Sequence, residues 1–172
     1  MNTTHLHLMV NHLPVIATPI VALLLVYGLV RGSREILRLA AGAAVIVAAL
    51  SYPVFLTGGP AEERVEDSTW FQERMVHDHE ERAEVALIVV LVTGLVAAVG
   101  LWQSRGGRDL PRATAGITLA GLALSAGLFG WTALAGGVIR HDEIRAGAMA
   151  GAPVDSGEVQ VGDRKHDRDD KD

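Results

Sequence analysis

Hydrophobic positions along this chain gather in four long stretches that contain no Asp, Glu, Lys or Arg. These charge-free stretches are residues 1–30, 39–61, 85–104 and 113–139. A helix needs about 20 apolar residues to cross a hydrocarbon core of about 30 Å, whereas a helix of a soluble domain carries charge along one face. The pattern therefore predicts an all-α integral membrane protein with four transmembrane helices. We place these helices at Leu13–Val30, Ile36–Thr57, Val85–Trp102 and Ala113–Ile139.

The charges between the stretches predict how the helices are oriented. The two short connections and the adjoining helix start are rich in arginine, with Arg31, Arg34, Arg38, Arg105, Arg108 and Arg112. The central loop, residues 58–84, is mostly acidic. Since Lys and Arg close to a span stay on the cytoplasmic side, we expect an up-down bundle in the bacterial inner membrane. Both termini and the central loop then lie outside.

Local signals add detail to this topology. Gly59–Glu63 is typical of a helix start, and Trp70–Glu84 is predicted to run as a helix into the third span. Asp109 and Pro111 are expected to form the N-cap and first turn of the fourth helix. Beyond the bundle the chain becomes polar with mixed charge. We therefore expect a four-helix domain over 1–148 and a disordered hydrophilic tail over 149–172.

Composition excludes several classes of function. The absence of cysteine excludes disulfides, thiolate metal sites, iron–sulfur ligation and covalent c-type haem. The net charge of −5, without a long basic run, argues against nucleic acid as a partner. No zinc-hydrolase HExxH motif and no phosphate-binding glycine loop occurs, and the serines and threonines of the spans lack a nearby base. We therefore expect a non-catalytic redox or binding subunit.

The histidines are the residues that we expect to bind a cofactor or a metal ion. His12 stands at the mouth of the first span, His77 and His79 precede the third, and His141 follows the fourth. In an up-down bundle these helix ends meet at the outer face. Imidazole nitrogens from different helices at one depth can bind haem iron or a transition metal ion. The sequence therefore predicts a histidine cluster on the outer side of the membrane.

Several short motifs resemble a known family. His12-Leu13-Pro14 opens the first span, Thr57-Gly58 closes the second, His79 precedes the third, and residues 136–141 (Gly-Gly-Val-Ile-Arg-His) end the fourth. Over residues 5–145 the chain resembles a bacterial four-helix membrane domain of unknown function, found alone or fused to Rieske or c-type cytochrome domains. The resemblance implies respiratory or periplasmic redox work, with the helices acting as a haem or quinone module.

Three hypotheses about the function follow. In the first, the protein is an electron-transfer subunit with haem b held by His12 and His79, with His141 as a substitute ligand and Gly136 and Gly137 making room for the flat cofactor. In the second, a copper, zinc or iron ion is bound by a set drawn from His5, His7, His12, His77, His79 and Glu63. In the third, the histidines are interfacial and the protein is a structural subunit. The lipid bilayer and a periplasmic or membrane redox protein are the expected partners, and the sequence leaves a homo-oligomer open.

Overall fold

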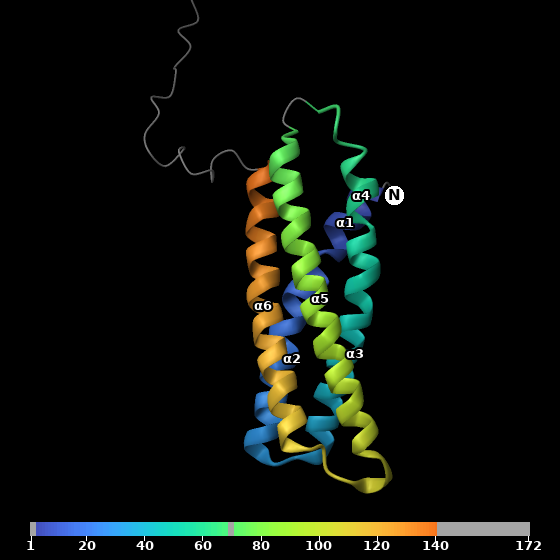
Figure 1. Ribbon diagram of the computed structural model, residues 1–172, viewed down its shortest axis with the longest axis vertical. Helices are drawn as coiled ribbons and strands as arrows, with labels where there is room; N and C mark the ends of the chain where they lie inside the picture. Colours follow the sequence, from blue (N-terminus) through green and yellow to red (C-terminus); the bar gives the residue numbers. More distant parts are fainter. Residues whose placement is uncertain (1–2, 69–70, 141–172) are drawn as a thin grey trace, which may run out of the picture.

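The computed structural model of the protein describes residues 3–68 and 71–140. These residues form α-helices joined by short turns, without a strand among them. The helices are α1 (Thr3–Val10), α2 (His12–Arg31), α3 (Arg34–Leu56), α4 (Gly58–Glu62), α5 (Glu73–Gln103) and α6 (Arg112–Arg140), with a 3₁₀ turn, η1 (Arg105–Gly107), before α6 (Figure 1). The predicted tail and His141 lie outside the described residues.

Four of these helices are long and apolar enough to cross a membrane. They coincide with the four predicted spans, with Thr57 of the second span lying just past the end of its helix, which confirms the all-α class and the number of candidate spans. The third of these helices, α5, is longer than its apolar segment. It begins at Glu73 and continues through the charged residues that precede Val85 into the predicted span. Lengths and compositions of this kind are those of a multi-pass membrane protein.

The four long helices pack side by side, and consecutive ones run in opposite directions (Figure 1). Helix α2 contacts α3, α3 contacts α5, α5 contacts α6, and α6 returns to contact α2. Small residues allow this close approach, which is how helices commonly associate in lipid. A Cβ atom added at Gly94 of α5 would overlap the Ala48 side chain of α3, and one added at Gly121 of α6 would overlap Thr93.

One end of the bundle, called here the arginine end, carries both short connections. Gly32 ends α2 in a left-handed conformation (φ 60°), and the Ser33 side chain caps α3 by accepting from the Ile36 amide. The predicted N-cap role of Asp109 is wrong: α6 begins at Arg112, and the Asp109 carboxylate instead pairs with Arg34 of α3. A guanidinium on a neighbouring helix thus takes the carboxylate away from the local backbone amides.

The opposite end, called here the histidine end, carries α1 and α4. Asn11, between α1 and α2, keeps helical backbone angles (φ −63°, ψ −25°) and its amide bonds to the His7 carbonyl, so α1 continues the first candidate span outward and packs against α4. Helix α4 lies where the sequence predicts a helix start. His5 lies in α1 and His12 opens α2, and both belong to the one candidate span Thr4–Arg31, which begins where the sequence predicts that the two share a face.

Candidate functional site

His79 of α5 is fixed between two helices at the histidine end. Its Nδ1 lies 3.0 Å from the Thr132 carbonyl oxygen of α6. A carbonyl oxygen only accepts hydrogen bonds, so Nδ1 carries the proton and donates it. In the neutral ring the lone pair is therefore on Nε2, the form in which a histidine binds a metal.

Gly136, one turn beyond Thr132 in α6, makes this position of the ring available. A Cβ atom at Gly136 would lie 3.1 Å from Cε1 and 3.3 Å from Nδ1 of His79, which is tighter than ordinary van der Waals contact. The space predicted to accommodate a flat cofactor is thus occupied at Gly136 by the imidazole of His79. Gly137, the other predicted residue, is its neighbour in α6.

His7 of α1 is fixed in a corresponding way to the other side of the histidine end. Its Nδ1 lies 2.8 Å from the Thr57 hydroxyl oxygen at the end of α3. That hydroxyl donates its single hydrogen to the Val54 carbonyl at 2.6 Å. The Thr57 oxygen can therefore only accept from His7, so Nδ1 again carries the proton and Nε2 the lone pair.

The two fixed histidines belong to one neighbourhood. His79 is among the charges that act on His7, which places both rings at the same end of the bundle. Both rings are half-buried, and each is tied through Nδ1 to an acceptor that is distant in sequence. The hydrogen bonds found for the two rings within the described residues are those of Nδ1, with the Val54 carbonyl as a further acceptor beside the His7 ring. The histidine end thus holds two oriented imidazoles with the same nitrogen available.

The other predicted ligands lie apart from this pair. His12 is exposed, with Nδ1 3.0 Å from the Leu8 carbonyl, and His77 is exposed, with Nε2 3.4 Å from Glu81. His5 and Glu63 are exposed as well. Within residues 3–68 and 71–140, no three His, Asp or Glu side chains are grouped as a metal site requires. His141 lies outside the described residues.

Two carboxyl groups couple α4 to α5 beside the histidine pair. Partial burial raises the pKa of the Glu62 carboxyl above its usual range, and Glu80 raises it further through its charge and through a hydrogen bond between the two side chains. A proton on the Glu62 carboxyl removes the repulsion by Glu80 and allows the hydrogen bond between the two side chains. Glu80 follows His79 directly, so this pair lies next to one of the two fixed imidazoles.

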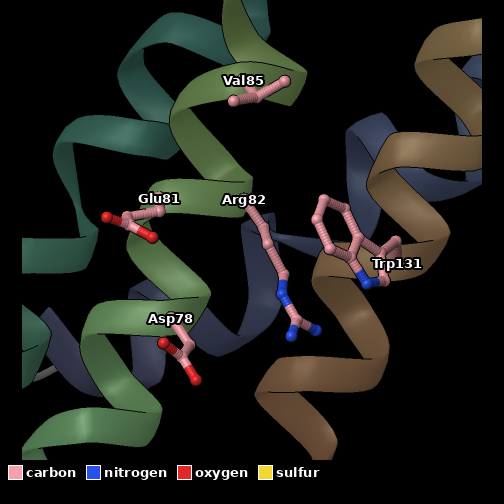
Figure 2. A pocket seen from close by; sticks show the side chains of 5 residues that line it. All are labelled: Asp78, Glu81, Arg82, Val85 and Trp131. Carbon is pink, nitrogen blue, oxygen red and sulfur yellow. The ribbon is translucent and has the colours of Figure 1, made fainter.

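A separate groove lies on the surface of α5 and α6 (Figure 2). It has a volume of about 300 Å³ and is lined by Asp78, Glu81, Arg82, Val85 and Trp131. The Arg82 guanidinium carbon lies 4.4 Å from the centre of the Trp131 ring, which is a cation–π contact between the two helices. Neither His7 nor His79 lines this groove.

Sequence reasoning identified both histidines but missed the groups that orient them. Thr57 and Thr132 are ordinary threonines in apolar helices, and their partners lie 50 and 53 residues away. The available signal was Gly136, because a side chain at that position would crowd the His79 ring, whereas a Cβ at Gly58 would meet His7 only at an ordinary contact distance of 3.8 Å. No family model, no curated protein and no solved structure matches this chain.

Proposed function

We propose that this protein is a membrane subunit of an electron-transfer system that binds haem b through the Nε2 atoms of His7 and His79. The observation that carries the proposal is the shared tautomer of these two rings, each with Nδ1 held by the protein and Nε2 available. His7 replaces the predicted His12 as partner of His79, because the exposed His12 ring bonds only to the preceding turn of its own segment.

The number of ligands favours haem over a bare metal ion. Zinc and copper sites usually take three or four protein ligands, whereas the described residues bring together two fixed imidazoles and no group of three. Haem iron needs only one or two axial ligands from the protein, because the porphyrin supplies the other four. When bound, the haem supplies one-electron redox chemistry. Thr57 and Thr132 hold the two imidazoles in the ligating orientation.

The two ends of the bundle suggest where such a subunit works. Arginines gather at the end opposite to the histidine pair, and the positive-inside rule assigns that end to the cytoplasm. The histidine end then faces the outer side of a bacterial inner membrane, where the termini also lie. The family resemblance of the short motifs supports a periplasmic or membrane redox protein as the electron partner.

The test is a dithionite-reduced minus oxidised absorption spectrum of the protein purified in mild detergent. We expect the bands of a non-covalent b-type haem in the wild type, and their loss in His7→Ala and His79→Ala. His77→Ala is the matched control, since His77 is exposed on the same helix and pairs with Glu81. Full haem content in both the His7 and His79 variants would overturn the proposal.

Three further outcomes would change the assignment. Loss of haem in His12→Ala with retention in His7→Ala would restore the predicted His12–His79 pair. A flat spectrum from cells supplied with haem, with one equivalent of copper, zinc or iron by elemental analysis, would replace haem by a bare ion. A flat spectrum without metal would leave the structural subunit as the function.

A further inference from the structure

The groove on α5 and α6 continues into a second, smaller hollow. The smaller hollow measures about 180 Å³ and is lined by Met75, Asp78, Arg82, Ala135 and Val138. Asp78 and Arg82 line both hollows, so they form the boundary between them. The result is one elongated groove, called here the Arg82 groove, with apolar walls at both ends and two opposite charges in its middle.

These two charges are not paired with each other. Asp78 and Arg82 are one helical turn apart, a spacing at which opposite charges commonly form an ion pair. Arg82 instead reaches across to the Trp131 ring of α6, while Glu81 points away from that ring and lies 3.4 Å from His77 (Figure 2). Within the described part of the chain, neither Asp78 nor Arg82 has an ion-pair partner. The groove therefore offers a separate cationic group and a separate anionic group.

The Arg82 groove lies where the chain changes from charged to apolar. Glu84 is the last charged residue before the charge-free stretch 85–104, and Val85 and Trp131 form the wall of the groove on that side. In a membrane this boundary corresponds to the headgroup region, where tryptophan is enriched and arginine extends toward water. A molecule in the groove therefore meets polar groups and hydrocarbon at once.

We propose that the Arg82 groove binds a zwitterionic phospholipid with a primary ammonium headgroup, such as phosphatidylethanolamine. The phosphate pairs with the Arg82 guanidinium, the ammonium donates to the Asp78 carboxylate, and an acyl chain lies along Val85 and Trp131. One guanidinium and one carboxylate in the middle of the groove match a headgroup that carries both charges better than a headgroup with net negative charge. A quaternary ammonium has no N–H to donate, so phosphatidylcholine makes the weaker complex.

The test measures lipid binding to the purified full-length protein in detergent by native mass spectrometry. Short-chain phosphatidylethanolamine, phosphatidylcholine and phosphatidylglycerol are each titrated, with glycerophosphoethanolamine as the headgroup without chains. We expect phosphatidylethanolamine to bind most tightly and the soluble headgroup not to compete at equal concentration. Equal affinity for the three lipids, or equal binding of the chain-free headgroup, would overturn the proposal without any variant.

Variants then test which side chain binds which part of the headgroup. Arg82→Gln is expected to weaken phosphatidylethanolamine binding about tenfold or more, as loss of a charge-assisted hydrogen bond does. Asp78→Asn is expected to remove the preference for ethanolamine over choline. Arg74→Gln is the control, since Arg74 is exposed on the same helix and does not line the groove. Arg82→Gln binding as tightly as Arg74→Gln, with unchanged melting temperature, contradicts the assignment.

Discussion

A single hydroxyl decides the state of His7. The Thr57 oxygen accepts from Nδ1 because its own hydrogen is already donated to Val54. Valine has nearly the shape of threonine but lacks that oxygen, so Thr57→Val removes the hydrogen bond between Nδ1–H and Thr57 and leaves the Val54 carbonyl as the remaining acceptor beside the ring. The loss of one such hydrogen bond costs about 0.5–1.5 kcal/mol. It also frees the ring to rotate or to exchange tautomers, which lowers the occupancy of a ligand held at Nε2.

We therefore expect Thr57→Val to lower both the melting temperature and the haem content, and Thr57→Ser to preserve both, because serine keeps the hydroxyl. The measurements are thermal unfolding in detergent and the reduced minus oxidised spectrum. If the serine and valine variants behave alike, the hydroxyl does not orient His7.

The carboxyl pair of Glu62 and Glu80 makes the contact between α4 and α5 sensitive to pH. Burial and Glu80 raise the pKa of Glu62 in the folded protein, so the fold favours the protonated carboxyl. The pair therefore stabilises the contact at low pH. This stabilisation is lost as the pH rises from the ordinary carboxyl range through the raised pKa of Glu62, where the Glu62 carboxylate is repelled by the neighbouring acidic side chains.

Hydrogen exchange of the α4 amides between pH 4 and pH 8, corrected for the intrinsic exchange rate, measures this effect. Protection is expected to fall with rising pH in the wild type and to stay constant in Glu62→Gln. Glu63→Gln, a change at the exposed next residue, should keep the wild-type dependence. Protection that is independent of pH in the wild type would exclude a proton-linked contact.

At the scale of the element, helix positions were predictable and helix ends were less so. The apolar span predicted at Val85–Trp102 lies inside α5, Glu73–Gln103, because the charge-free length reports only the part that fits hydrocarbon. The start of α6 shows the other limit. Asp109 is a good N-cap residue by type, but Arg34, 75 residues earlier, provides a stronger partner. Local sequence holds no information on that partner.

The closeness of the helices gives an element-scale prediction. A side chain at Gly94 of α5 would overlap Ala48 of α3, so Gly94→Ala must push the two helices apart. Overpacking of this kind costs about 1–3 kcal/mol. Gly42→Ala in α3 is the control, because nothing lies within 4 Å of the added Cβ, and alanine favours the helix by up to about 1 kcal/mol.

Thermal unfolding in mild detergent is expected to rank the variants with Gly94→Ala below the wild type and Gly42→Ala at or above it. The opposite order would mean that α3 and α5 do not pack through these glycine and alanine surfaces.

At the scale of the whole molecule, the two ends of the bundle differ in chemistry. One end gathers arginines and the other gathers histidines and carboxylates, which is how the sequence predicts the orientation in the membrane. The absence of native cysteine makes this testable with single introduced thiols. We expect Glu63→Cys to react with a membrane-impermeant maleimide on spheroplasts, and Glu35→Cys to react only after lysis. Labelling in the reverse pattern would place the histidine end in the cytoplasm.

The candidate site was predictable in part, because the arrangement of the helix ends is a property of the whole bundle. His79 and Gly136 emerge from the sequence because helix ends in an up-down bundle meet at known depths. The choice between His7 and His12 does not, since it depends on the packing of α1 against α4 and on the contact of His7 with Thr57. Both are tertiary contacts, which the hydrophobic pattern of the first span does not encode.

The long sequence separations at the histidine pair also have a consequence for biosynthesis. The His7 ring can be oriented only after Thr57 has been synthesised. The His79 ring can be oriented only after Thr132, which lies near the end of the last long helix. A nascent chain that has inserted α2, α3 and α5 already holds both histidines but has only one of them oriented. Under the proposed function, cofactor insertion is therefore the last step of assembly, and chains stalled before α6 would be membrane-inserted and colourless.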